Sequence, residues 1–140
     1  MPYEELIKKA IKAKQYAYAP YSGFPVGAAL LTEEGKVYTG CNIECASYGA
    51  TNCAERTAIF KAVSEGERNI EAIAVVSSSD DYTYPCGICR QVIMEFGNKI
   101  KIIAARSEHD YKVHVIDDLL PDSFSSEDLK KTGGGYKDGI

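Results

Sequence analysis

Three cysteines at the starts of helical segments constrain this chain more than any other feature. Cys86 and Cys89 open a segment with helical spacing that ends near Phe96, and Cys53 opens an earlier one that ends near Ser64. Two thiols at positions i and i+3 can converge on one ion, and a third from another helix start can complete the cluster. Helix N-termini carry partial positive charge and therefore favour the thiolate form. We therefore expect a fold in which two helix starts meet.

The rest of the pattern alternates apolar strands with amphipathic helices. A helix is expected from residue 4 until Pro20 stops it, and the turn chemistry of residues 33–36 predicts a hairpin. Ser125 to Asp128 form a capping-box pattern for a short last helix. The expected helices cover residues 4–19, 53–64 and 86–96, and the expected strands cover residues 24–32, 37–44, 70–77, 99–105 and 111–116. This order predicts an α/β layer fold with a partly parallel sheet.

The length of 140 residues corresponds to about one domain. We assign a single domain to residues 1–131 and expect residues 132–140, which include three consecutive glycines, to form a flexible tail. The formal net charge is −4, and the sequence contains no basic stripe of the kind that neutralises phosphates, so nucleic acid is not an expected partner. We expect no membrane span and no signal peptide, and hence a cytoplasmic location.

Five cysteines in a chain without a visible export signal favour metal binding or catalysis over a disulfide framework. Zinc is the ion expected for thiolates in this arrangement. Three ligands leave one position open for catalysis, whereas a fourth ligand closes the site and makes it structural. Cys41 and Cys45 are the candidates for a fourth ligand, although such cysteines more often pack as small buried apolar residues.

Two charged residues follow Cys53 in the first helical turn. Glu55 is either an acidic residue favoured by the helix dipole or a general acid and base beside a metal-bound water. Arg56 is either a surface residue or a hydrogen-bond donor to the sulfurs, which would offset the charge of −1 that three thiolates and Zn²⁺ share. His109 and His114 match no ligand position, and we assign no chemistry to them.

The combination of Cys53-Ala54-Glu55 with Pro85-Cys86-Gly87-Ile88-Cys89 resembles the signature of the zinc-dependent deaminases, in which a glutamate acts without binding the metal. Within that superfamily the chain is similar to the small homotetrameric three-cysteine cytidine deaminases. Further matching segments are residues 18–22, 24–30, 40–44, 53–60, 86–92 and 119–121. The segment from 45 to 52 departs from the family pattern at Cys45 and Gly49. The polar, acidic stretch from 77 to 84 can affect access or assembly.

The resemblance implies a three-layer α/β/α fold with a five-stranded mixed sheet. It also implies that Cys53, Cys86 and Cys89 bind one Zn²⁺ per subunit and that Glu55 is the proton shuttle. Asn42 matches half of a ribose-binding pair, and its partner Glu44 lies two residues further on, on the same face of an extended strand. An amide beside a carboxylate can recognise sugar hydroxyls.

The resemblance also assigns residues around the base. Phe24 matches an aromatic residue near the pyrimidine, and Ala54 is expected to offer backbone polar groups to the base. Phe124 matches an aromatic residue that a neighbouring subunit delivers, and Tyr48 lies in a segment that also crosses subunits. Gln91 is expected to form a structural hydrogen bond.

The implied activity is hydrolytic deamination of cytidine and deoxycytidine to uridine and deoxyuridine, with release of ammonia, in pyrimidine salvage. The implied partners are a small nucleoside substrate and further copies of the chain in a homotetramer with shared active sites. One alternative is a deaminase of another cytosine-containing small molecule, such as blasticidin S. The other is a structural zinc module without catalysis, which needs four protein ligands.

Overall fold

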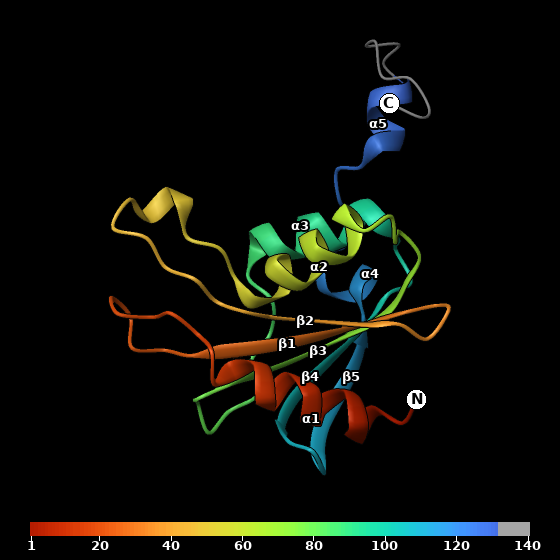
Figure 1. Ribbon diagram of the computed structural model, residues 1–140. Helices are drawn as coiled ribbons and strands as arrows, with labels where there is room; N and C mark the ends of the chain where they lie inside the picture. Colours follow the sequence, from red (N-terminus) through yellow and green to blue (C-terminus); the bar gives the residue numbers. More distant parts are fainter. Residues whose placement is uncertain (132–140) are drawn as a thin grey trace.

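The computed structural model describes residues 1–131 and places five strands in one sheet with helices on both faces (Figure 1). The strands lie in the order β2-β1-β3-β4-β5. The strands are Val26–Thr32 (β1), Val37–Cys41 (β2), Ile70–Ser77 (β3), Lys101–Ser107 (β4) and Asp110–Val115 (β5), and the helices are Tyr3–Lys14 (α1), Ala54–Ser64 (α2), Gly87–Phe96 (α3), Ile116–Leu119 (α4) and Ser126–Lys131 (α5). The predicted three-layer α/β/α architecture is confirmed.

The sheet is mixed because one strand pair runs in parallel. β3 and β4 are parallel, whereas β1 is antiparallel to both β2 and β3, and β4 is antiparallel to β5. Antiparallel strands can be joined by short hairpins, but a parallel pair needs a crossover connection. Helix α3 is that connection, and it brings Cys86 and Cys89 to the same face as α2.

Strand β1 separates two apolar cores because successive side chains point to opposite faces. Ala28 and Leu30 pack with α2 and α3, whereas Ala29 and Leu31 pack with α1. All four side chains are buried, so the central strand is apolar on both faces, as a covered sheet requires. The two cores fix which helices face each other, and α2 and α3 share one side of the sheet.

The first helix is shorter than predicted. Helix α1 ends at Lys14, not at residue 19, and the backbone beyond it bonds to a distant segment. The Tyr18 N–H donates to the Asn42 carbonyl, 2.9 Å away, and the Glu44 N–H donates to the Tyr18 carbonyl, 2.8 Å away. Residues 15–17 still bond to residues 12–14 in turns, and the non-local hydrogen bonds direct the chain away from the helix at Tyr18.

The second strand was also predicted too long, because β2 ends at Cys41. Beyond it, Ile43 forms isolated bridges to Tyr18 and Asn52, so this segment is extended but lies outside the sheet. The 3-10 turn at Tyr48–Ala50 and the short helix α4 were not predicted. The first strand starts at 26, not 24, and the last two strands occupy 101–107 and 110–115. The predicted tail, 132–140, lies outside the described residues.

A glycine allows α2 to pack closely on the edge strand. A Cβ atom at Gly40 in β2 would lie 2.5 Å from the Ala54 carbonyl oxygen and 2.6 Å from the Ala58 nitrogen. Contacts this short with helix backbone cannot be relieved by a side-chain rotation. Gly40 therefore sets the distance between β2 and the first turn of α2, which carries Glu55.

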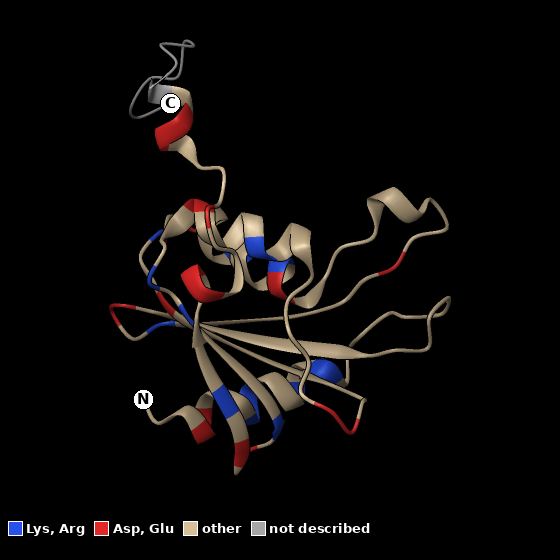
Figure 2. Ribbon diagram, turned by 180° about the vertical axis from the view of Figure 1, so that it is seen from behind, with Lys and Arg blue, Asp and Glu red and all other residues tan. Residues whose placement is uncertain are grey.

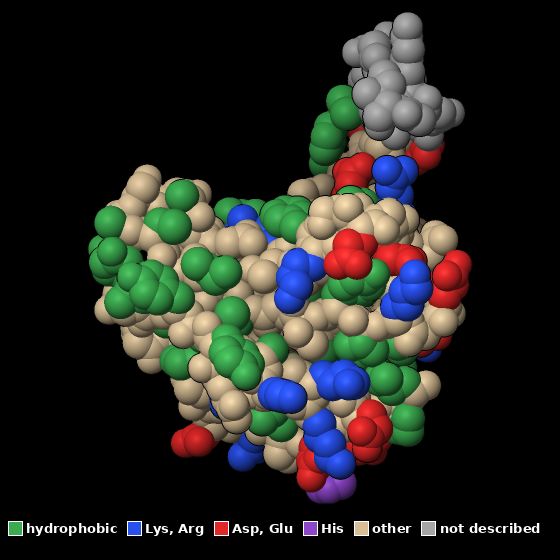
Figure 3. Space-filling view, viewed as in Figure 1, with side chains coloured by type: hydrophobic (Ala, Val, Ile, Leu, Met, Phe, Trp, Pro, Cys, Tyr) green, Lys and Arg blue, Asp and Glu red, His purple; other side chains and the backbone are tan. Residues whose placement is uncertain are grey.

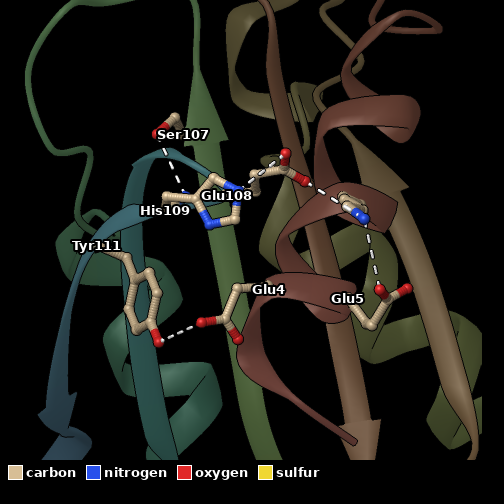
Figure 4. A network of polar contacts seen from close by, with 7 residues as sticks. Glu4, Glu5, Ser107, Glu108, His109 and Tyr111 are labelled. Atoms are coloured by element: carbon tan, nitrogen blue, oxygen red, sulfur yellow. Dashed lines mark hydrogen bonds and ion pairs between the residues drawn. The ribbon is translucent and has the colours of Figure 1, made fainter.

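Helix α1 is tied to the hairpin formed by β4 and β5 (Figure 4). The Tyr111 hydroxyl donates to Glu4 over 3.1 Å, and Lys8 forms ion pairs with Glu5 and Glu108 at 3.5 and 3.6 Å. Acidic and basic residues are scattered over helices, strands and turns (Figure 2). Within residues 1–131, no helix combines the length and the apolar character that crossing a bilayer requires.

Candidate metal centre

Cys53 and Cys86 occupy the N-cap positions of α2 and α3. Neither side chain caps its own helix, although N-cap side chains commonly bond the free N–H groups of the first turn. Their sulfurs instead face each other across 3.7 Å, and Cys89, in the first turn of α3, completes the group. The three Sγ atoms all lie within 4.8 Å of one another.

This arrangement fits a zinc ion. Two sulfurs bound at about 2.3 Å to one tetrahedral ion lie roughly 3.8 Å apart. The observed distance of 3.7 Å between Cys53 and Cys86 matches that value. Among residues 1–131, the only group of three or more potential metal ligands is Cys53, Cys86 and Cys89. Three protein ligands leave one coordination position for water or substrate.

The surroundings of the cluster favour thiolate. Hydrogen bonds from Cys89, Arg56 and Cys86 lower the pKa of Cys53 to about 5. The hydrogen bond with Cys53 raises the pKa of Cys89, so the first negative charge of the pair resides on Cys53. The Arg56 guanidinium donates to the Cys53 sulfur over 3.3 Å, which is the contact proposed for it from the sequence.

Cys41 and Cys45 lie outside the cluster. Cys41, at the end of β2, lines a separate cavity of about 530 Å³ along this edge strand, to which α1 and α2 also contribute residues, and burial raises the pKa of its thiol. The Cys45 thiol contacts the Ala50 carbonyl at 3.8 Å within its own loop. Neither joins the group that could hold a metal, so the geometry gives no support to a closed site with four cysteines.

A cavity of about 450 Å³ opens directly beside the cluster. Its walls come from the loop before β1, the segment after β2, the start of α2 and the loop before α3. Five of the residues singled out from the sequence for catalysis or substrate binding line it, together with two of the cysteines: Phe24, Asn42, Glu44, Ala54, Glu55, Cys53 and Cys86. The fold therefore brings most of the predicted site together.

Glu55 lies in the first turn of α2 with 4% of its surface exposed, yet it lines the cavity. Burial, which disfavours the charged form, raises the pKa of Glu55 to about 7. A buried carboxyl group beside a metal cluster and facing a cavity can exchange protons with a bound molecule. Glu55 does not belong to the group of potential ligands.

Asn42 and Glu44 already form hydrogen bonds within the chain. The Asn42 side chain accepts from the Val26 N–H and donates to the Phe24 carbonyl, both at 2.9 Å. Glu44 accepts from the backbone N–H groups of Tyr21 and Ser22 at 3.0 Å, and also from the Ser22 hydroxyl. These bonds, the Ser22 hydroxyl foremost, hold the pKa of Glu44 below its usual range.

The remaining predicted residues do not reach this cavity within one chain. Tyr48 is 75% exposed and lines a neighbouring shallow hollow with Tyr21 and Glu44. Phe124 is 60% exposed and lies on the arm before α5, which stands clear of the other helices (Figure 1). The Gln91 amide donates to the Phe124 carbonyl over 2.6 Å and so links α3 to that arm.

The structure adds cavity residues that the sequence did not single out. Ser22, Thr83 and Tyr84 line the cavity although they carry no metal-ligating or pattern-forming signal. Ser22 lies within the matching segment 18–22, which was the only clue to it. Thr83 and Tyr84 belong to the loop from 78 to 85, whose polar sequence shows nothing of its distant contacts.

Comparisons with known proteins show the family to which this chain belongs. The family described as "Cytidine and deoxycytidylate deaminase zinc-binding region" matches residues 1–105. The cytidine deaminase of Sporosarcina psychrophila is 52% identical over 130 residues, covering 92% of this chain and 96% of the relative. The cytidine deaminase of Halalkalibacterium halodurans is 50% identical over 130 residues, covering 92% of this chain and 98% of the relative.

Solved structures show the same similarity. The crystal structure of cytidine deaminase from Burkholderia pseudomallei superposes with a TM-score of 0.85 at 49% identity, covering 89% of this chain and all of that one. The crystal structure of cytidine deaminase from Mycobacterium tuberculosis has a TM-score of 0.79 at 39% identity, covering 89% of this chain and 98% of that one. With its three-cysteine cluster, its buried glutamate and its five-stranded sheet, the chain belongs to the zinc-binding family of cytidine and deoxycytidylate deaminases.

Proposed function

We propose that this protein hydrolyses cytidine and deoxycytidine to uridine and deoxyuridine with release of ammonia. One observation carries the proposal: three converging sulfurs lie beside a buried glutamate at the wall of a cavity large enough for a nucleoside. Cys53, Cys86 and Cys89 would hold a zinc ion, which would supply an activated water molecule by lowering the pKa of that water towards neutrality. A fourth cysteine ligand, which a structural module needs, is not in reach of the cluster formed by the described residues.

Glu55 moves the protons in this proposal. Addition of water at C4 of the cytosine ring requires a base for the proton of the water, and departure of ammonia requires an acid for the exocyclic nitrogen. Glu55 accepts the first proton and delivers it to N3. It then takes the remaining proton from the hydroxyl group on C4 and passes it to the amine, so that the C4 carbonyl forms as the bond to ammonia breaks. Its burial supports this dual role, because a desolvated carboxyl group gains and loses a proton near neutral pH.

The sugar end of the substrate is assigned to Asn42 and Glu44. Both line the same cavity as Glu55, and their mutual contacts with the segment from Tyr21 to Val26 hold them in place. The amide and the carboxylate retain further hydrogen-bonding capacity for sugar hydroxyls. Phe24 lies on the same wall and offers an aromatic ring to the base, and Ala54 lines the cavity at the start of α2.

We also propose that the protein works as a homotetramer with shared active sites. Hydrophobic side chains gather at the left of the face shown in Figure 3. The exposed aromatic residues of the chain include Tyr18, Tyr21 and Tyr48, and the last two line the hollow next to the cavity. Tyr48 and Phe124 stay outside the cavity of their own chain, so a neighbouring copy would have to deliver them. A cytoplasmic location is part of the proposal, since a reducing compartment preserves the free thiols that the cluster requires.

The decisive experiment replaces the proposed proton shuttle with its isosteric amide. Glu55→Gln should fold and retain zinc but lose cytidine deamination by at least about 100-fold, the lower range for a general acid and base. Glu95→Gln, an exposed glutamate on α3, is the matched control and should keep full activity. Zinc content is measured by metal analysis, and turnover by the ultraviolet change from cytidine to uridine.

Two outcomes of this experiment would contradict the proposal. Full activity of Glu55→Gln would remove this residue from the mechanism. A wild-type protein that binds zinc but leaves cytidine and deoxycytidine unchanged would overturn the proposed function. Free cytosine and blasticidin S belong in the same assay, because turnover of either one in place of the nucleosides would assign a different substrate.

A further inference from the structure

The loop from 78 to 85 forms a wall of the cavity immediately before the metal-binding segment. Thr83 and Tyr84 line the cavity, and Pro85 and Cys86 follow directly. This loop connects β3 to α3, so it is anchored at one end by the sheet and at the other by the N-cap of α3. The position of its side chains therefore decides the shape of the cavity next to the cluster.

Tyr84 packs against a residue of β5, His114. Its ring meets the His114 ring edge-on, with centroids 5.3 Å apart and an angle of 66° between the planes. The Tyr84 hydroxyl lies 3.4 Å from Nε2 of His114. His114 itself is fixed by the sheet, because β5 pairs with β4 at Ile102. Edge-to-face pairs of this kind are favourable beyond their buried area.

A second contact group holds the same loop to the same hairpin. The Tyr82 hydroxyl donates to Asp110 over 2.5 Å, and the charged groups of Lys112 and Arg106 lie 4.6 and 5.5 Å from the centre of its ring. Tyr82 and Tyr84 are thus both docked on the β4–β5 hairpin. Between them, the hydroxyl of Thr83 bonds to that of Ser77, at the end of β3, over 2.5 Å. The loop has little freedom to move away from the cavity.

The place of this wall relative to the substrate follows from the proposed function, on which the inference rests. The reacting carbon C4 is flanked in the ring by N3 and C5. N3 faces Glu55 on α2, so C5 points away from Glu55. The cavity wall before α3 holds Thr83 and Tyr84 next to Cys86, whose sulfur belongs to the cluster at the reacting carbon.

We propose that Tyr84 is the specificity-determining wall beside C5 of the ring and that His114 is the residue that positions it. With Tyr84 held against His114, a methyl group on C5 has no room. Without His114, the Tyr84 ring can turn into the space left on the hairpin, and the cavity accepts the larger base. A ring-sized residue at 114 keeps the edge contact and therefore keeps the selectivity.

The test compares cytidine with 5-methylcytidine as substrates. The wild type should prefer cytidine by about tenfold or more in kcat/KM, the range for one methyl group in a shaped pocket. His114→Ala should reduce that preference at least about fivefold, through a lower KM for 5-methylcytidine. His114→Phe should restore it. His109→Ala, the other histidine of the hairpin, is the matched control and should leave both the preference and the activity unchanged.

Tyr84→Ala removes the wall directly and keeps the test valid if His114→Ala does not fold. It should reduce the preference for cytidine while zinc content stays unchanged. An equal preference in the wild type and in both variants would overturn the inference, as would a wild type that uses the two nucleosides equally well. Cytidine turnover by the wild type in the same assay shows that the proposed function stands, so failure of the inference alone can be recognised.

Discussion

Glu44 illustrates how the chain itself orients a residue that we propose binds the substrate. Its carboxylate accepts three hydrogen bonds from the segment before β1, two from backbone N–H groups and one from the Ser22 hydroxyl. Hydrogen bonds to the charged form stabilise it, which explains the lowered pKa. A side chain that is already oriented loses less conformational freedom when a sugar binds. The same contacts also fasten the loop that carries Phe24.

Replacement of this carboxylate should affect both affinity and stability. Glu44→Gln should raise the KM for cytidine by about tenfold or more, because hydrogen bonds to a charged group are stronger than those to a neutral amide. Its effect on stability should depend on pH. The folded-state pKa is depressed, so the stabilisation is complete above the ordinary value near 4.3 and disappears as the pH falls through the lower folded value.

Urea unfolding of both proteins between pH 7 and pH 3 measures this dependence. The midpoint of the wild type should exceed that of Glu44→Gln at pH 7, and the gap should close below about pH 4. Glu71→Gln, at an exposed position of β3, is the control. A gap that stays constant over the whole range would show that the charge of Glu44 does not stabilise the fold.

Residue patterns predicted the cysteine cluster better than the residues proposed to bind the sugar. Cys86 and Cys89 are neighbours on one helical turn, so their proximity is a local property that the spacing reveals. Asn42 and Glu44 were expected on a strand, but they lie beyond β2. His114 was given no role, because its contact with Tyr84 joins positions 30 residues apart and no local pattern records it.

Among the elements, α2 deserves a direct test, because it carries Glu55 and starts at Cys53. Gly40→Ala places a methyl group within 2.6 Å of two backbone atoms of this helix. We expect α2 to shift and the free energy of unfolding to fall by about 1–3 kcal/mol, the usual cost of overpacking. Urea unfolding at fixed zinc concentration measures the loss, and zinc content and activity should fall with it.

Gly87→Ala serves as the control for this substitution. Gly87 opens α3, between two of the cysteines, but an added Cβ there meets nothing within 4 Å. Its stability should stay close to that of the wild type. Equal stability of Gly40→Ala and the wild type would mean that α2 does not depend on the close contact.

The sequence predicted most elements but not all of their ends. The hairpin of β1 and β2 and the helices after Cys53 and Cys86 were predicted because apolar periodicity and turn residues are local signals. The end of α1 was missed because hydrogen bonds from Tyr18 to the segment after β2 compete with the helix. For α5, one of the two bonds of the predicted capping box is present, since Asp128 accepts the Ser125 N–H at 2.8 Å.

For the whole molecule, the proposed assembly makes a prediction about mixed subunits. Phe124→Ala should bind zinc but show a KM for cytidine raised by about tenfold or more, since buried aromatic anchors contribute 2 kcal/mol or more. Tyr16→Ala, which removes another exposed aromatic side chain but beside the other cavity, should leave the KM unchanged. If a neighbour delivers Phe124, mixing Phe124→Ala with Glu55→Gln subunits should create some complete sites and recover activity.

Subunit exchange is followed by light scattering, and activity by the cytidine assay. Activity that never exceeds the sum of the two separate variants, despite exchange, would show that each chain uses its own Phe124. A monomeric mass at assay concentration would contradict the proposed assembly itself. The three-layer architecture was predictable because it follows from element order and the family resemblance. The position of the arm before α5 was not, since it involves contacts between distant positions, such as the bond from Gln91 to the Phe124 carbonyl.

The short distance between the sulfurs of Cys53 and Cys86 has a chemical consequence for handling the protein. A thiolate with a lowered pKa next to a second thiol reacts readily with peroxide, first to a sulfenic acid and then, with loss of water, to a disulfide. Coordination protects both sulfurs, so chelation exposes them. Protein stripped by a chelator and stored in air should then be rescued by a reductant, and not by added zinc alone.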